Sequence, residues 1–119
     1  MAKINRKQVH EKYNGRCAYC GEKIHFKDMQ VDHIIPKARF HQFAKRVEYD
    51  IDDIQNLNPT CRVCNNWKGG WLLEEFRHEI SEQVNRLRKY SAQFRLAERY
   101  RRIVELETSV QFYFEFTYF

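Results

Sequence analysis

The chain lacks long hydrophobic runs: no apolar stretch approaches the ~18–20 residues that a membrane-spanning helix needs. Its first residues also lack the apolar stretch of a secretory signal peptide, so we expect a cytoplasmic protein. Glycine and proline are scarce, at four and two residues, and all six precede residue 71. Residues 71–119 therefore contain neither common helix breaker, which predicts mostly uninterrupted regular structure there.

Positive charge is in modest excess, with 21 Lys and Arg against 16 Asp and Glu and a net charge of +5. Residues 1–70 carry 13 basic and 8 acidic side chains, whereas residues 71–119 carry eight of each. A length of 119 residues fits one compact domain, and 43% hydrophobic content is enough for a core. The charge is compatible with nucleic acid as a partner but does not identify one.

Local patterns predict an α+β chain whose first part alternates short elements with turns. Turn and cap residues set the expected boundaries of these elements. In order, we predict a helix at residues 6–13 capped by Asn5, a strand at residues 29–35 ended by Pro36, a solvated acidic loop at residues 48–53, an extended segment at residues 56–59, and a helix at residues 61–68 capped by Thr60 and closed by Gly69.

The second part is predicted to be helical and to end in a strand. From Leu72, apolar side chains recur every three or four residues as far as Leu87, and Ser91 can cap a further helix. Residues 110–119 alternate apolar and polar side chains, the pattern of a strand. We therefore divide the chain into a cysteine-bearing part, residues 1–70, and a helical extension with a C-terminal aromatic strand, residues 71–119, packed as one domain.

The four cysteines form two Cys-x-x-Cys pairs, Cys17 with Cys20 and Cys61 with Cys64. Two such pairs can complete one tetrahedral four-cysteine site, which predicts a structural zinc ion. Two disulfides or four unpaired core cysteines are the alternatives, and disulfides conflict with an intracellular setting. A closed site of this kind has no open coordination position, so we expect this metal to stabilise the fold.

A second group of polar residues lies between and beside the cysteine pairs. Asp32 and His33 end the predicted strand, Asn56 precedes the second pair, and Asn65 and Lys68 follow it on the predicted helix. Carboxylate and carboxamide oxygens suit Mg²⁺ or Mn²⁺, and a neutral histidine beside such an ion can act as a general base. These residues are compatible with a one-metal hydrolytic site, although Asp-His pairs are more often surface hydrogen-bond partners.

Together these motifs resemble the HNH endonucleases, in the variant whose third signature residue is Asn. The resemblance covers residues 5–70 and is carried by Cys17-x-x-Cys20, Asp32-His33-Ile34-Ile35-Pro36, Asn56-Leu57-Asn58-Pro59 and Cys61-Arg62-Val63-Cys64-Asn65-Asn66-Trp67-Lys68-Gly69. It implies a ββα-metal finger stapled by the four-cysteine zinc site. The segment from Asp32 to Asn56 spans 24 positions, longer than the compact version of the family, so its loop is enlarged.

The resemblance also implies a role for each residue in a metal-dependent DNA endonuclease. It implies that His33 activates water, that Asp32 and Asn65 bind a catalytic Mg²⁺ or Mn²⁺, and that Asn56 braces the loop and helps to orient His33. Lys68 occupies a commonly basic position and is a candidate contact for phosphate. Asn66 is a rival to Asn65, which is favoured because it follows the second cysteine pair directly.

Further contacts with DNA are expected from basic residues, and a partner protein from the aromatic strand. The candidate DNA-binding residues are Arg62, Arg86, Arg88, Lys89, Arg95 and Arg99. Ion pairs with neighbouring acids are the alternative interpretation of the helical ones. An exposed aromatic strand is an aggregation hazard, so the strand is expected in the core or against a second copy or another protein.

Two other functions remain open on the sequence alone. One is a non-catalytic, zinc-ribbon-like nucleic-acid-binding module, in which the Asp-His pair is inert. The other is a protein-interaction adaptor, which only the aromatic segment supports. Stand-alone proteins of this family are often encoded by phages or mobile elements, and we extend that setting to this chain by analogy alone.

Overall fold

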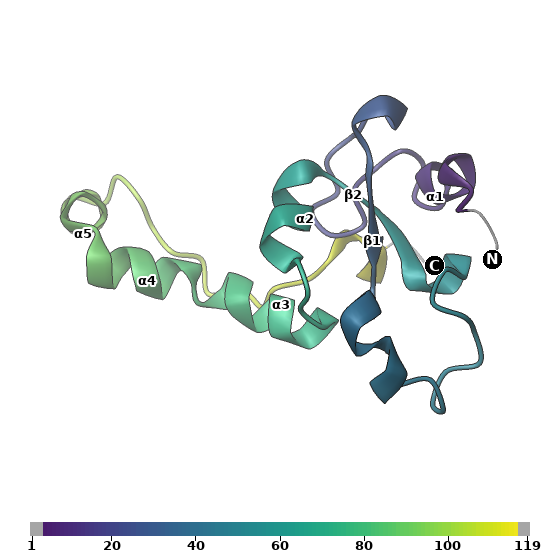
Figure 1. The fold of residues 1–119 in the computed structure, drawn as a ribbon. Helices are drawn as coiled ribbons and strands as arrows, with labels where there is room; N and C mark the ends of the chain where they lie inside the picture. The colour runs from purple at the N-terminus through teal and green to yellow at the C-terminus, as the bar shows by residue number, and fades with distance from the viewer. Residues whose placement is uncertain (1–3, 117–119) are drawn as a thin grey trace. The chain divides into compact units, whose positions relative to one another are not determined.

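A computed structural model describes residues 4–116 and divides the chain into two compact units. The first unit takes the residues up to Leu73 and those from Gln111 onward, and the second is Glu74–Val110. In Figure 1 the yellow C-terminal segment accordingly returns to the unit that contains β1, β2 and α2. Among the described residues, no helix is long and apolar enough to cross a membrane.

The first unit is built on a two-stranded antiparallel sheet followed directly by a helix (Figure 1). Strand β1 pairs with β2 from Gln30 opposite Thr60 to His33 opposite Leu57. Its core packs Val9, Met29 and Leu57. The elements are α1 (Arg6–Glu11), β1 (Gln30–His33), β2 (Leu57–Thr60) and α2 (Arg62–Lys68), with short 3₁₀ helices at Phe26–Asp28, Lys37–Gln42, Ile54–Asn56 and Tyr113–Glu115. This confirms the small α+β fold class.

The ends of the helices agree with the sequence in two places and differ in one. The Asn5 side chain caps α1 by accepting a hydrogen bond from the Gln8 N–H at 3.2 Å. Gly69 closes α2 with a φ of 47°, a conformation that favours glycine. The cap of α2, however, is Cys61, whose Sγ accepts from the Cys64 N–H at 3.4 Å, so the prediction for Thr60 is wrong. Thr60 instead ends β2.

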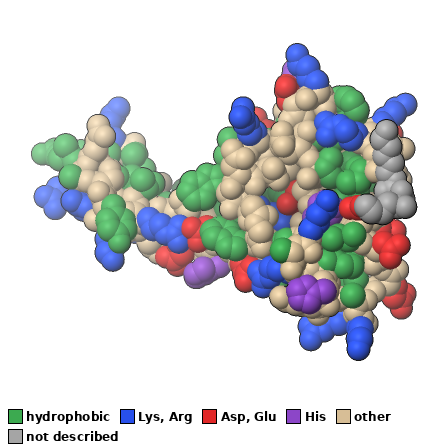
Figure 2. Space-filling model, in the orientation of Figure 1, with side chains coloured by type: hydrophobic (Ala, Val, Ile, Leu, Met, Phe, Trp, Pro, Cys, Tyr) green, Lys and Arg blue, Asp and Glu red, His purple; other side chains and the backbone are tan. Residues whose placement is uncertain are grey.

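The second unit contains α3 (Leu73–Ser81) apart from its first residue, α4 (Gln83–Tyr90), α5 (Ala92–Arg99) and the segment that follows them. The apolar periodicity predicts helix here, and the structure interrupts it only at Glu82, which separates α3 from α4. The Ser91 hydroxyl accepts from the Phe94 N–H at 3.0 Å and begins α5, as predicted. Helices α4 and α5 contain no fully buried residue, and Figure 2 shows hydrophobic side chains on their surface.

The predicted C-terminal strand is wrong over the described residues, because the chain there forms irregular structure and the 3₁₀ helix Tyr113–Glu115. The N–H groups of Tyr113 and Phe114 donate to the carbonyls of Tyr19 and Ala18 at 2.9 Å. The Phe112 N–H donates to the Glu115 carboxylate at 2.7 Å, a contact at the start of this 3₁₀ helix. Residues 117–119, the end of the predicted strand, lie outside the described residues.

Candidate metal centre and active site

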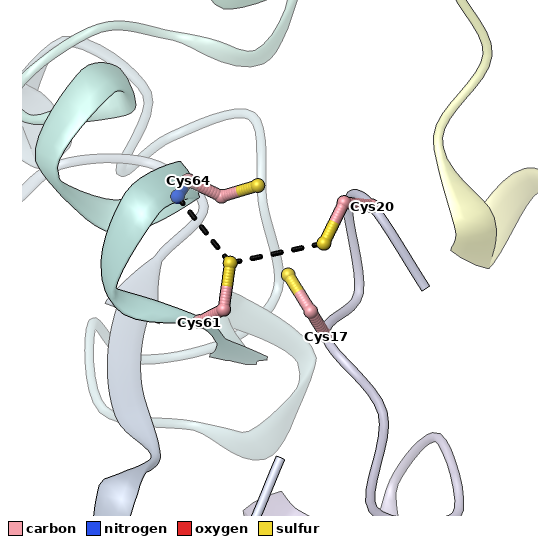
Figure 3. Close-up of side chains that lie close together, drawn as sticks. All are labelled: Cys17, Cys20, Cys61 and Cys64. Atoms are coloured by element: carbon pink, nitrogen blue, oxygen red, sulfur yellow. Dashed lines mark hydrogen bonds between the residues drawn. The ribbon is translucent and has the colours of Figure 1, made fainter. Parts of the chain in front are cut away.

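The four cysteines lie in two segments that are far apart in the sequence and close together in the fold. Figure 3 shows Cys17 and Cys20 on a loop facing Cys61 and Cys64 at the start of α2, with their sulfurs turned toward one another. All four Sγ atoms lie within 4.8 Å of one another, and those of Cys20 and Cys61 are 3.7 Å apart. All four thiols are free, so the disulfide alternative is absent from the structure.

This cluster fits a tetrahedral metal ion. A Zn–S bond of ~2.3 Å in tetrahedral geometry places sulfurs about 3.8 Å apart, close to the Cys20–Cys61 separation. The hydrogen bond from Cys64 lowers the pKa of the Cys17 thiol to about 4, whereas burial raises the pKa of Cys20 to about 12. The cluster therefore favours one thiolate but resists several, and a bound dication would remove that resistance. The four cysteines could hold a metal such as zinc.

Three of the predicted site residues line one cavity. Asp32 and His33 at the end of β1 and Asn65 on α2 surround a cavity of about 370 Å³, together with Pro36, Lys37 and Gly69 among others. Asn66 lies elsewhere, since it lines a separate cavity with Arg62 and Lys27. The fold therefore brings Asp32, His33 and Asn65 together and places the rival Asn66 apart from them.

The carboxylate of Asp32 is buried and accepts hydrogen bonds from two side chains. Its Oδ2 accepts a hydrogen bond from the Tyr19 hydroxyl, and its Oδ1 accepts from the Lys68 ammonium at 3.2 Å. Burial raises the pKa of Asp32, and the nearby Lys68 charge opposes that shift. Tyr19 lies between Cys17 and Cys20, and Lys68 ends the helix that carries Cys64. Both partners of Asp32 thus come from the segments that carry the cysteines.

The side chain of Lys68 forms its contacts inside the protein. Its ammonium is buried and donates to Asp32 and to the carbonyls of His33 and Ile34 at 3.1 and 3.2 Å. Burial lowers its pKa, and the Asp32 carboxylate opposes this shift. The predicted contact with phosphate stays a prediction, and the contact that the structure describes is the one with Asp32.

His33 has a partner that the sequence did not point to. Its Nε2 lies 2.8 Å from Oδ1 of Asp52, and the two side chains are 13% and 22% exposed. Asp52 belongs to the acidic stretch at residues 48–53, for which the sequence predicts a solvated loop. Asp52 does lie in a loop, but its side chain is only 22% exposed and contacts His33. The pairing joins positions 19 residues apart in a loop without periodicity, so no sequence signal could have found it.

Asn56 is fully buried and holds backbone groups of the loop before it. Its Oδ1 accepts from the Ile35 N–H at 2.8 Å, and its Nδ2 donates to the Ile51 carbonyl at 2.9 Å and to the Ile35 carbonyl at 3.2 Å. The side chain thus joins the segment that follows His33 to the segment that precedes Asp52. Any influence of Asn56 on the imidazole of His33 passes through these backbone contacts.

The candidate DNA-binding arginines of the second unit are largely engaged with neighbouring groups. Arg86 pairs with Glu79, and Arg88 pairs with Glu98 at 2.6 Å and with Glu105 at 2.9 Å. Arg95 donates to the carbonyls of Arg88 and Lys89 at the end of α4. Lys89, Arg99 and, in the first unit, Arg62 are exposed. The contacts of Arg86 and Arg88 agree with the ion-pair interpretation.

The segment that carries this site is similar in sequence to known proteins. Residues 17–70 match the family model described as HNH endonuclease. The chain is 35% identical over 68 residues to a protein named CRISPR-associated endonuclease Cas9 from Corynebacterium diphtheriae, a match that covers 57% of this chain and 6% of that protein. A crystal structure of the type II-C Cas9 enzyme from Actinomyces naeslundii matches 78% of this chain and 11% of its own, at 22% identity and a TM-score of 0.49.

The matched segment contains all four cysteines and the whole cavity of Asp32, His33 and Asn65. Residues 17–70 belong to the HNH endonuclease family, and this domain is homologous to the corresponding region of Cas9. The chain spans only a small fraction of the length of the Cas9 protein that it matches.

Proposed function

We propose that this chain is a metal-dependent DNA endonuclease that hydrolyses phosphodiester bonds in the cavity lined by Asp32, His33 and Asn65. The observation that carries the proposal is that these three side chains share one cavity inside the segment that matches the HNH endonucleases. The name of the Cas9 relative, an endonuclease, supports the same class of reaction.

In this proposal Asp32 and Asn65 hold Mg²⁺ or Mn²⁺. Both offer oxygen ligands, which these hard cations prefer, and Asp32 adds a negative charge. A cation bound there would stabilise the charge that develops on the phosphate and on the leaving oxygen. Each oxygen of Asp32 has a second lone pair besides the one that accepts from Tyr19 or Lys68, so those contacts leave the carboxylate able to bind.

His33 is the proposed general base. Its imidazole takes a proton from a water molecule as the water oxygen attacks phosphorus. The bond between phosphorus and the 3′ oxygen breaks, and that oxygen takes a proton from solvent, which leaves a 5′-phosphate and a 3′-hydroxyl. Asn56 keeps the loop beside His33 in place through its three backbone hydrogen bonds. Lys68 holds the charge of Asp32 inside the protein and is in this account a supporting residue.

Nicking of supercoiled plasmid with Mg²⁺ or Mn²⁺ tests the catalytic proposal. We expect His33→Ala to lose about 10²–10⁴ in rate, the usual contribution of general-base catalysis. His25→Ala is the matched control, because His25 is exposed and caps no helix with its side chain, and it should cut like the wild type. Intact plasmid with every divalent ion, together with retained DNA binding, would instead favour the non-catalytic binding module.

We also propose that the four cysteines hold a structural zinc ion. Metal analysis of the purified protein should find about one zinc per chain, and Cys61→Ser should lower both the zinc content and the unfolding temperature. Structural zinc sites in small domains contribute ~10–16 kcal/mol of apparent binding free energy, so chelation should unfold the first unit. A metal-free protein with the wild-type circular dichroism spectrum and unfolding temperature would contradict this assignment.

A further inference from the structure

The contact between Asp52 and His33 occurs in the loop that is enlarged relative to the compact HNH pattern. Residues 34–56 connect the two strands, and Asp52 lies near the end of this segment. Its Oδ1 approaches Nε2 of His33 to 2.8 Å, a full-strength hydrogen-bond distance. Both side chains are mostly shielded from solvent, which makes the contact stronger than one on an open surface.

The chemistry of the two groups decides which nitrogen carries the proton. An ionised carboxylate can only accept hydrogen bonds, so Nε2 of His33 must be the donor. In a neutral imidazole the other nitrogen is then the acceptor, which leaves Nδ1 as the atom that can take a proton from water. We propose that Asp52 is a positioning residue that fixes the orientation and tautomer of His33, an inference that rests on the proposed nuclease function.

The backbone on both sides of Asp52 is held in place, so its carboxylate does not sit on a free loop. The Ile51 carbonyl accepts from the Asn56 side chain at 2.9 Å. The Asp53 N–H donates to the Asp50 carbonyl at 3.0 Å, and the Asp53 carboxylate caps the 3₁₀ helix Ile54–Asn56. Fixed partners of this kind are what keep a catalytic side chain in a productive geometry.

In this arrangement the enlarged loop has a role in positioning His33. The loop returns a carboxylate to the end of β1, where His33 lies beside Asp32 on the strand. Asn56 then acts on the same imidazole indirectly, since it fixes the backbone before Asp52 and after His33. Asn56 therefore holds the backbone of the loop, and Asp52 contacts the imidazole of His33.

Two substitutions and one matched control test the proposal in the full chain loaded with zinc. Asp52→Ala removes the acceptor, and Asp52→Asn keeps the size but replaces one oxygen by an N–H₂ group. Asp50→Asn is the control, because Asp50 is an exposed acid two residues earlier in the same loop. Steady-state cleavage of a DNA substrate gives kcat and KM, and ¹⁵N NMR of the histidine rings at a pH where they are neutral gives the tautomer of His33.

We expect both Asp52 variants to lower kcat at least tenfold, within the ~10²–10⁴ that a general base contributes, and to leave KM unchanged. The NMR signals of His33 should change from the Nε2-protonated tautomer to a mixture, while Asp50→Asn matches the wild type in both readouts. A His33 tautomer that is the same in wild type and Asp52→Ala, or an unchanged kcat, overturns the proposal. If the wild type cleaves no DNA, the nuclease proposal fails, while the NMR comparison still decides whether Asp52 fixes the ring.

Discussion

At the scale of single residues, the first unit contains a buried ion pair between Asp32 and Lys68. The exposed fractions of the two side chains are 4% and 0%. A buried ion pair adds little stability compared with two apolar side chains, but removing one partner leaves a costly uncompensated charge. The role of Lys68 in this pair is therefore to compensate the charge of the Asp32 carboxylate, which is buried at the end of β1.

A double-mutant cycle measures this dependence. Lys68→Met should lower the free energy of unfolding by about 3–5 kcal/mol, because it leaves the Asp32 carboxylate buried and unpaired. Adding Asp32→Asn should restore a large part of the loss, since the remaining amide carries no charge. Urea unfolding of the zinc-loaded proteins gives these values.

Arg62→Met serves as the control for the lysine substitution. Arg62 lies exposed on the same helix, and surface changes of this kind usually stay within about 0.5 kcal/mol. A double variant no more stable than Lys68→Met alone would show that the ion pair does not account for the loss.

At the scale of elements, the C-terminal segment is part of the first unit despite its distance in sequence. Phe112 is 1% exposed and meets the ring of Tyr19 edge to face, with a centroid separation of 5.2 Å. Tyr19 in turn donates to Asp32. The aromatic segment therefore packs against the loop between Cys17 and Cys20, and its apolar side chains stabilise that loop.

An alanine substitution at one buried side chain tests how much this segment contributes to stability. Phe112→Ala should cost about 3–5 kcal/mol in the free energy of unfolding, the usual range for a buried phenylalanine. Phe116→Ala should cost much less, because Phe116 is 45% exposed. Equal losses at the two positions in thermal or urea unfolding would contradict a packing role specific to Phe112.

The sequence predicted those elements whose signals are local. Asn5, Ser91 and Gly69 mark helix ends through contacts within a few residues, and the cysteine spacing predicts the cluster because each pair spans a single turn. The alternation at residues 110–119 wrongly predicts a strand, because the backbone of this segment donates hydrogen bonds to the loop at Ala18 and Tyr19 and not to another strand. Periodicity shows which side chains share a face but not which backbone they meet.

The site shows the same division between local and long-range information. The motif order predicts that Asp32, His33 and Asn65 lie together, because it implies a strand next to a helix. In the structure the three residues line one cavity. The contacts of Asp52 and of Lys68 join residues 19 and 36 positions apart through side chains alone. Such contacts depend on the final packing and leave no local pattern in the sequence.

At the scale of the whole molecule, the positive charge of the first part does not form a single patch on the face that Figure 2 shows. On the face shown in Figure 2, Lys and Arg side chains of the first unit are dispersed over the surface. Lys68 contributes nothing to that surface because it is buried, and several arginines of the second unit are paired with acids. The net charge of +5 therefore supports a nucleic-acid partner less directly than the cavity of Asp32, His33 and Asn65 does.

The central claim is that this cavity is a metal-dependent hydrolytic site, and binding of Mn²⁺ to the zinc-loaded protein, followed by electron paramagnetic resonance, tests it most directly. We predict one site per chain in the wild type, weakened by Asn65→Ala at least as much as the about 10- to 100-fold that the loss of an outer-shell partner costs, because the substitution removes a proposed ligand. Asn66→Ala should bind like the wild type, since Asn66 lines a different cavity. Absence of Mn²⁺ binding, or equal weakening by the two substitutions, would contradict the account.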